Sequence, residues 1–172
     1  MKILLIGDTH GMDDLFVAIK RKESPFDMLL HVGDVEESKR FYQRCGVQAL
    51  FVRGNCDDYS DDPVERVVDV EGCRIYMTHG HCLDVDGTEA SLRALCGAAV
   101  EKGADVVVFG HTHMPLNVVR DGVLILNPGS LAFKKNRQGF SVIQLPSGIA
   151  PFLSIDKNKC LQTCVWCDIL YV

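Results

Sequence analysis

Short apolar runs, separated by glycine and polar clusters, recur along the first two thirds of the chain. Because these runs lack polar alternation, they are typical of strands that are buried on both faces. They cover residues 2–6, 28–32, 49–52, 74–77 and 106–109. The segments between these runs have apolar residues at helical spacing, which predicts helices. One contains Leu15 and Ile19 and follows the acidic start Asp13-Asp14, and the other runs from Leu92 through Leu95 to Val100 and follows Thr88 as an N-cap. Strands that alternate with helices predict an α/β fold with a largely parallel central sheet.

The last third of the chain has a different pattern. Residues 116–120 and 123–126 flank Asp121-Gly122, which is the strongest short signal for a β-hairpin. Two further apolar runs, 140–145 and 152–155, also predict strands. We therefore expect antiparallel pairing to complete the architecture, with a second sheet packed on the first.

The composition indicates one ordinary globular domain. The chain has 172 residues, of which 47% are hydrophobic and 24% charged, and this usage excludes a disordered, collagen-like or coiled-coil protein. We expect one domain over residues 1–156 and a short tail over 157–172. The net charge of −5 argues against general nucleic-acid binding. The first apolar run soon meets Asp8, too early for a signal peptide or membrane span, so we predict a cytoplasmic protein without membrane contact.

Five of the eight cysteines are dispersed through otherwise apolar segments, and we expect them to be reduced thiols: Cys45, Cys56, Cys73, Cys82 and Cys96. The other three crowd the tail as Cys160-x3-Cys164-x2-Cys167. This spacing is similar to that of radical-SAM iron-sulfur ligands, but those belong to a much larger barrel domain. The alternatives are a disordered tail, adventitious metal binding or oxidation, and docking on a partner. The apolar residues of the tail favour docking, for example at the interface of a homo-oligomer.

Five of the predicted strands are followed by glycine and by side chains that can bind a metal ion. The blocks are Gly7-Asp8-Thr9-His10, Gly33-Asp34, Gly54-Asn55-Cys56-Asp57, His79-Gly80-His81 and Gly110-His111-Thr112-His113. Ligands of open α/β sheets bind beyond the carboxyl ends of the strands, so these groups should converge. Carboxylate, imidazole and amide donors without a thiolate set suit Mn²⁺, Fe²⁺, Zn²⁺ or Ni²⁺. Each block alone could be a turn, a cap or a hydrogen-bonded loop histidine, but five in this order favour a metal centre.

These blocks resemble the calcineurin-like metallophosphoesterase superfamily, whose motifs occur in the order Asp-x-His, Gly-Asp, Gly-Asn-His-Asp/Glu, His and Gly-His-x-His. The resemblance extends from Asp8 to His113, about two thirds of the domain. The short chain, His79-Gly80-His81 and Asn127-Pro128-Gly129-Ser130 are most similar to the small YfcE-type phosphodiesterase branch. The resemblance implies an α/β fold that is a four-layer α/β/β/α sandwich with two mixed β-sheets.

The resemblance also implies a role for each motif residue. Asp8, His10 and His113 would hold one metal ion, and Asn55, His79 and His111 a second. Asp34 would bridge both ions. We expect two divalent cations, Mn²⁺ first, with Zn²⁺, Fe²⁺ or Ni²⁺ as alternatives. Asp34, Asn55 and His81 are the predicted catalytic residues.

One block departs from the superfamily pattern, because Cys56 stands where most members have histidine. That histidine is credited with helping the leaving group, and a thiol is a poorer acid at neutral pH than imidazole. Cys56 is then a small side chain that fills the histidine's space. His81 is a substitute proton donor or, alternatively, a structural residue. We expect a phosphodiesterase that prefers good leaving groups, such as aryl diesters, over unactivated monoesters.

The predicted reaction is hydrolysis of a small phosphodiester by a metal-bridging hydroxide. The main alternative is a catalytically weak or inactive protein-binding scaffold of the same fold, as in the retromer subunit. A nuclease is disfavoured, because such relatives carry further domains and basic surfaces. Candidates for phosphate contact, with solvated surface charge as the alternative, are Arg53, Lys134, Lys135 and Arg137. The loop Asn127–Ser130 offers backbone donors, although ordinary turn chemistry also explains it.

Overall fold

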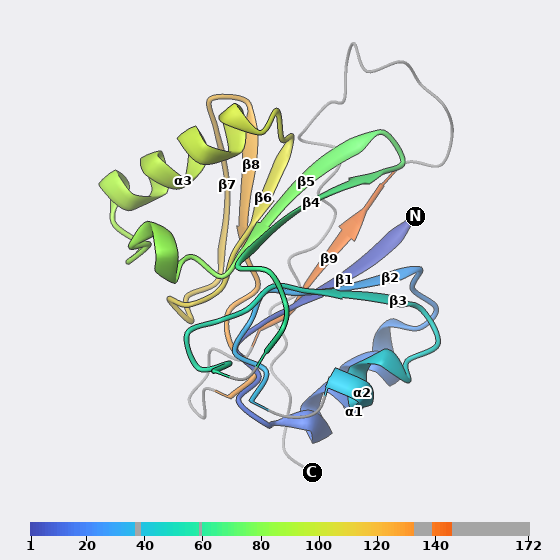
Figure 1. Cartoon of the computed structure of the whole chain (residues 1–172). Coiled ribbons are helices and arrows are strands. Elements are labelled where there is room, and N and C mark those ends of the chain that lie inside the picture. The colour runs from blue at the N-terminus through green and yellow to red at the C-terminus, as the bar shows by residue number, and fades with distance from the viewer. Residues whose placement is uncertain (37–38, 59, 133–138, 146–172) are drawn as a thin grey trace.

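The computed structural model describes residues 1–36, 39–58, 60–132 and 139–145, which form two β-sheets with helices on their outer faces (Figure 1). The first sheet has the order β3-β2-β1-β9, with bounds Gln48–Phe51, Met28–His31, Lys2–Ile6 and Ser141–Gln144. The second has the order β4-β5-β6-β8-β7, with bounds Glu65–Val70, Cys73–Thr78, Val106–Val108, Val123–Asn127 and Leu116–Arg120. Among the described residues, the helices are α1 (Asp13–Glu23), α2 (Lys39–Gln43), α3 (Glu89–Glu101) and the 3-10 turn η1 (His81–Leu83).

Both sheets are mixed, as predicted. β1, β2 and β3 run parallel to one another, while β9 pairs antiparallel with β1. In the second sheet β5, β6 and β8 are parallel, and the edge strands β4 and β7 are antiparallel. The predicted hairpin is β7–β8, which turns at Asp121-Gly122. The parallel strands therefore end at the same edge of their sheet.

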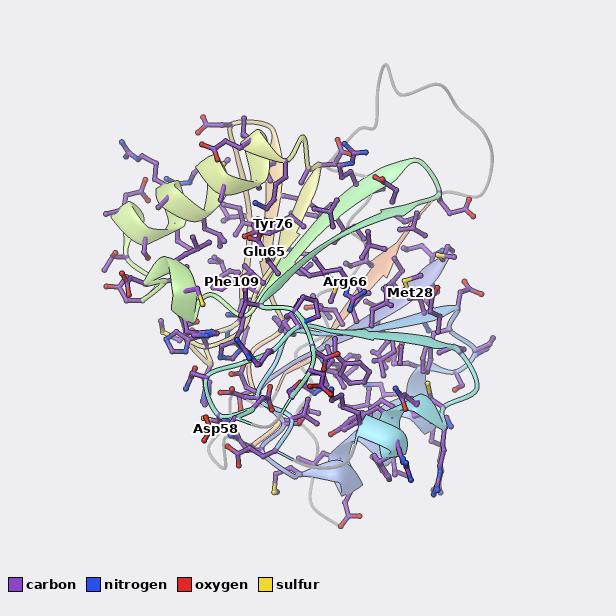
Figure 2. The ribbon with its side chains drawn as sticks, in the orientation of Figure 1. Met28, Asp58, Glu65, Arg66, Tyr76 and Phe109 are labelled. Carbon is purple, nitrogen blue, oxygen red and sulfur yellow. The ribbon has the colours of Figure 1, made fainter. Side chains whose placement is uncertain are left out.

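The alternation of side chains along each strand explains the layers. Ile3 and Leu5 on β1 belong to the apolar cluster between the two sheets, together with Met28 (Figure 2). Leu4 and Ile6 point to the opposite face, where they pack with residues of α1 and α2 such as Phe16 and Tyr42. α3 covers the outer face of the second sheet through Leu92, Leu95, Cys96 and Ala99. The predicted four-layer α/β/β/α sandwich is confirmed.

The predicted N-cap of α3 is also present. The Thr88 hydroxyl accepts a hydrogen bond from the backbone N–H of Ser91 at 3.3 Å. This bond satisfies one of the N–H groups that a helix start leaves without a partner, and such a cap contributes about 1 kcal/mol. α3 therefore begins at a defined position, which also fixes the loop that precedes it.

Three elements were not predicted from the sequence, namely β4, α2 and η1. The residues of β4 alternate between exposed and more buried positions, because β4 lies at a sheet edge, so it lacks a continuous apolar run. The apolar run predicts a strand over residues 49–52 that is buried on both faces, whereas β3 is an edge strand in which Gln48 is exposed and Ala49 and Leu50 are only partly buried. None of the helices in the described ranges is both long and apolar enough to cross a membrane.

The predicted strand over 152–155, the domain boundary at residue 156, and the tail 157–172 with its three cysteines lie outside the described residues.

Candidate metal centre

The two sheets bring their motif loops to one place, beside the carboxyl ends of their parallel strands (Figure 1). Asp8, Asp34 and Asn55 follow β1, β2 and β3 of the first sheet. His10 also follows β1, while the other three histidines of the centre follow β5 and β6 of the second sheet, at His79, His111 and His113. The structure thus gathers all seven side chains that the sequence predicted as ligands.

Four of these side chains form a compact donor group. One ligand atom from each of Asp8, His10, Asp34 and His113 lies within 4.8 Å of all the others. Nε2 of His113 is 3.2 Å from Oδ1 of Asp8, and Nε2 of His10 is 3.4 Å from Nε2 of His113. Two carboxylates and two imidazoles at this spacing are a donor set that suits divalent transition metals.

The other donors surround the side-chain oxygen of Asn55. Oδ1 of Asn55 is 3.0 Å from Nε2 of His79 and 2.9 Å from Nδ1 of His111. Oδ2 of Asp34 is 3.4 Å from Nε2 of His79 and 3.7 Å from Nε2 of His10. The Asp34 carboxylate therefore lies between the two donor groups.

The hydrogen bonds of the outer ring nitrogens of His79 and His10 indicate which nitrogen of each neutral imidazole carries the proton. The other nitrogen, which faces the centre, is then unprotonated. Nδ1 of His79 lies 2.7 Å from the Val32 carbonyl, so it carries the proton that donates this bond. In the neutral ring, Nε2 then presents a lone pair to the oxygens of Asn55 and Asp34. Nδ1 of His10 likewise lies 2.7 Å from a carboxylate oxygen of Glu36. Lone pairs that face one another need a cation between them, and an outer partner that fixes the imidazole is typical of metal-bound histidine. The donor set therefore fits a divalent metal ion.

The electrostatics of the centre favour positive charge. Burial alone would raise the pKa of Asp34. The hydrogen bond and the charge of His79, together with the hydrogen bond from the Cys56 N–H, outweigh burial and lower this pKa well below its usual range. Burial also opposes a charge on His79, yet Asp34 and Asp8 raise its pKa. The hydrogen bond to Asp8 raises the pKa of His113. An ionised Asp34 at the centre attracts protons or metal cations.

The backbone at the centre is unusual. Five of the seven side chains belong to residues with positive φ, between 42° and 67°: Asp8, His10, Asp34, His111 and His113. Non-glycine residues rarely adopt this conformation, and such residues gather at functional sites. Glycine is required nearby, since a Cβ at Gly54 would collide with the Asp34 carboxylate. The strand ends are thus shaped to aim these side chains inward.

Asp57 holds two of these loops together, a role that the motif alone does not reveal. Its Oδ2 accepts hydrogen bonds from the backbone N–H groups of Asp34 and Gly54, at 2.8 and 2.9 Å. Its Oδ1 accepts from Val35 and Glu36, at 2.8 and 3.2 Å. One buried carboxylate thereby fixes the loop after β2 against the loop after β3.

Cys56 and His81 lie at the margin of the centre. Cys56 donates its backbone N–H to Oδ1 of Asp34 at 2.9 Å, and partial desolvation followed by the charge of Asp34 raises the pKa of its thiol to about 12. The His81 ring lies 5.3 Å from that of His79 and 6.3 Å from that of His111. Its Nε2 is 3.2 Å from Sγ of Cys82, and its Nδ1 is buried without a partner among the described residues.

The loop Asn127–Ser130 supports the centre from behind. The Asn127 amide donates to the Gly110 carbonyl at 2.8 Å and to the Thr112 hydroxyl at 3.1 Å. The Ser130 hydroxyl donates to the Asp8 carbonyl at 2.8 Å. These side chains fix the loops that carry Asp8 and His111. Of the predicted phosphate contacts, Arg53 is half-buried directly before Gly54, and Lys134, Lys135 and Arg137 lie outside the described residues.

Sequence patterns did not identify two further polar residues near the centre. Glu36 carries no motif signal, yet with His10 and Cys56 it forms a second group of potential ligand atoms. His31 lies within the apolar strand β2 and is fully buried, with Nδ1 accepting from the Gly33 N–H at 3.2 Å and Nε2 3.1 Å from the Thr9 hydroxyl. Burial lowers the pKa of His31 to about 3, so it is a neutral core residue.

Comparisons with known proteins agree with this geometry. Residues 1–146 match the family model described as the calcineurin-like phosphoesterase superfamily domain. The probable metallophosphoesterase YsnB of Bacillus subtilis is 33% identical over 160 residues, which cover 91% of this chain and 92% of that protein. The phosphodiesterase YfcE of Escherichia coli K12 is 27% identical over 121 residues, covering 65% of this chain and 60% of that protein. The crystal structure of Chaetomium thermophilum Vps29 has a TM-score of 0.69 and 22% identity, and covers 85% of this chain and 82% of that one.

Proposed function

Because the chain belongs to the calcineurin-like phosphoesterase superfamily, we propose that it is a phosphodiesterase whose centre holds two divalent metal ions. The observation that carries the proposal is the position of Asp34. Its carboxylate lies within 4 Å of Nε2 of His10 on one side and Nε2 of His79 on the other. A single aspartate between two donor groups is the arrangement that a pair of ions with a shared ligand requires.

In this proposal the two donor groups bind one ion each. Asp8, His10 and His113 hold the first, and Asn55, His79 and His111 hold the second. Asp34 contributes to both. All seven are oxygen or nitrogen donors with carboxylates among them, a set that suits Mn²⁺, and Zn²⁺, Fe²⁺ or Ni²⁺ as alternatives.

A pair of divalent ions supplies Lewis acidity for the phosphoryl oxygens and a water of lowered pKa. The residues of the chain prepare the centre for this chemistry. His10 and His79 keep their outer nitrogens protonated through Glu36 and the Val32 carbonyl, so that lone pairs face inward. The backbone N–H of His111 donates to both oxygens of Asp8, at 3.1 and 3.2 Å, and orients that carboxylate.

The side chains near Asp34 limit the range of substrates. An unactivated alkoxide needs a proton as it leaves, and the Cys56 thiol, whose pKa is raised to about 12, is a weak donor at neutral pH. His81 is the proposed substitute donor, next to His79 and His111. Small diesters with good leaving groups, such as aryl phosphodiesters, are therefore the proposed substrates. The negative net charge disfavours long nucleic acids.

A rate comparison tests this proposal. The purified protein, first stripped with a chelator and then supplied with Mn²⁺, is assayed on bis(p-nitrophenyl) phosphate and on an alkyl phosphomonoester. We expect faster turnover of the diester, loss of activity after chelation and loss in Asp34→Asn. Faster turnover of the alkyl monoester would overturn the proposed substrate class.

A protein-binding scaffold of this fold remains the second candidate, because Vps29 proteins share the architecture. Their identity to this chain is below 25%, so they support the fold and not the role. The donor set favours catalysis, since a scaffold has no chemical need for seven convergent ligands. Absence of both bound metal and turnover would favour the scaffold.

A further inference from the structure

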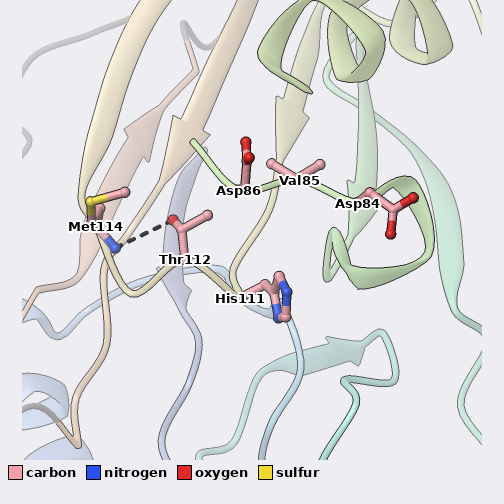
Figure 3. Close-up of a pocket in the computed structure, with 6 residues that line it drawn as sticks. All are labelled: Asp84, Val85, Asp86, His111, Thr112 and Met114. Carbon is pink, nitrogen blue, oxygen red and sulfur yellow. Dashed lines mark hydrogen bonds between the residues drawn. The ribbon is translucent and has the colours of Figure 1, made fainter. Parts of the chain in front are cut away.

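A cavity of about 410 Å³ opens beside the candidate metal centre. Its two walls are distant in sequence, as one connects η1 to α3 and the other connects β6 to β7 (Figure 3). The lining residues are Asp84, Val85, Asp86, His111, Thr112 and Met114. His111 belongs to both places, because its Nδ1 lies 2.9 Å from Oδ1 of Asn55. A substituent on a phosphate at the centre can therefore extend into the cavity.

The walls of the cavity are fixed by internal bonds. Asp86 accepts a hydrogen bond from the backbone N–H of Thr88 at 2.8 Å, which ties it to the start of α3. On the other wall, the backbone N–H of Met114 donates to the Thr112 hydroxyl at 3.4 Å (Figure 3). The walls meet at Gly87, where a Cβ would lie 2.8 Å from the terminal methyl of Met114. The cavity is therefore largely preformed, and its volume is in the range of small-molecule sites.

The charge of the lining is negative. Hydrogen bonds from Thr88 and Ser91 lower the pKa of Asp86 to about 2, so Asp86 is ionised. Asp84 is exposed, and its backbone N–H donates to the His81 carbonyl, but its carboxylate has no hydrogen-bond or ion-pair partner within the described part of the chain. None of the six lining residues is lysine or arginine, and the exposed side chain of Met114 adds apolar surface, whereas that of Val85 is buried. Two carboxylates beside apolar atoms suit a cation that carries methyl or methylene groups.

We propose that this cavity binds the substituent that stays on the phosphate during hydrolysis, and that Asp84 makes it selective for a positively charged substituent such as a trimethylammonium group. The inference rests on the proposed phosphodiesterase function. Water adds to phosphorus, the bond from phosphorus to the aryl oxygen breaks, and the aryl oxide leaves. The products are the phosphomonoester of the cationic alcohol and the phenol, with one water consumed.

Two substrates that differ only in charge test the inference. p-Nitrophenyl phosphorylcholine carries the trimethylammonium group, and 3,3-dimethylbutyl p-nitrophenyl phosphate is its neutral isostere with the same leaving group. We expect kcat/KM for the cationic ester to exceed that for the neutral ester about threefold or more at low salt, and this ratio to shrink at high salt. Calorimetric Kd values for phosphorylcholine and 3,3-dimethylbutyl phosphate give the same comparison without turnover.

A matched pair of variants assigns the effect to Asp84. Asp84→Asn should lower the ratio of the two kcat/KM values clearly below that of the wild-type protein, although Asp86 keeps its negative charge. Asp121→Asn is the control, because it removes the same charge in the distant β7–β8 turn. Both positions have left-handed backbone, with φ of 49° and 47°, a conformation that asparagine tolerates. The control should keep the wild-type ratio.

The outcomes separate this inference from the proposed function. Hydrolysis of both esters with a ratio near one in the wild-type protein would overturn the cationic subsite and leave the phosphodiesterase standing. A ratio that stays at the wild-type value in Asp84→Asn would overturn the role of Asp84. No hydrolysis of either ester with Mn²⁺ present would overturn the proposed function itself.

Discussion

The substitution Asp57→Asn removes one carboxylate oxygen from the centre of the loop network while keeping the size of the side chain. The two oxygens of Asp57 accept four backbone N–H groups between them, two each. An asparagine keeps one oxygen and places an NH2 group where the other stood. Whichever way the amide turns, two backbone N–H groups lose their acceptor and face another donor.

The expected cost follows from these bonds. A hydrogen bond to a charged group contributes about 1.5–3 kcal/mol, and a buried donor without an acceptor retains its desolvation penalty. Two lost bonds therefore lower the free energy of unfolding by about 3–6 kcal/mol, a large part of the about 5–15 kcal/mol that a domain has. Because the same N–H groups position Asp34 and the loop of Asn55, metal affinity should also fall.

Urea denaturation followed by far-UV circular dichroism measures this effect, in chelator so that bound metal does not contribute. Asp58→Asn is the matched control, since Asp58 is the exposed neighbour (Figure 2) and its substitution should change stability by about 0.5 kcal/mol or less. A loss below about 1 kcal/mol in Asp57→Asn, no larger than in the control, would refute the reasoning that this carboxylate fixes the loops.

Three further predictions concern a buried histidine, a glycine and the substituted motif residue. His31 has a pKa of about 3 in the folded chain against 6.5 for an unfolded one, so below pH 6.5 the unfolded chain binds a proton that the folded chain does not. The contribution of His31 to the free energy of unfolding is therefore fully present above pH 6.5 and falls by about 1.4 kcal/mol per pH unit below it. His31→Gln should flatten this slope when urea denaturation is measured between pH 7.5 and 5. An unchanged slope would contradict the prediction. Gly54→Ala should push the Asp34 carboxylate aside and weaken Mn²⁺ binding about tenfold or more in calorimetry. The control Gly97→Ala, at a position in α3 with open space around it, should leave Mn²⁺ binding intact. Equal Mn²⁺ affinities in the two variants would count against the placement of Asp34. Cys56→His restores an imidazole donor and should raise the monoester-to-diester rate ratio about tenfold or more, and a ratio that stays at the wild-type value would exclude a leaving-group role for this position.

The sequence predicted most of the fold because buried strands carry a strong signal. β1, β2 and β6 are apolar on both faces, so their residues form continuous runs. β4 escaped prediction because an edge strand buries one face and mixes charged with apolar residues. α2 has five residues, too few to show a helical period.

The candidate ligands were predictable for a related reason, since each lies in a glycine-containing loop that follows a strand. What the sequence could not show is how the ligands are held. The outer imidazole nitrogen of His79 bonds to a backbone carbonyl, and that of His10 bonds to Glu36, a residue that belongs to none of the sequence motifs. Three of the four bonds to Asp57 join residues that are more than twenty positions apart in sequence, and such contacts exist only after folding.

The most direct measurement is the anomalous diffraction of crystals grown with Mn²⁺. The account predicts two peaks per chain, one among Asp8, His10 and His113 and the other among Asn55, His79 and His111, with the Asp34 carboxylate in contact with both. A single ion, or two ions of which Asp34 touches only one, would contradict it.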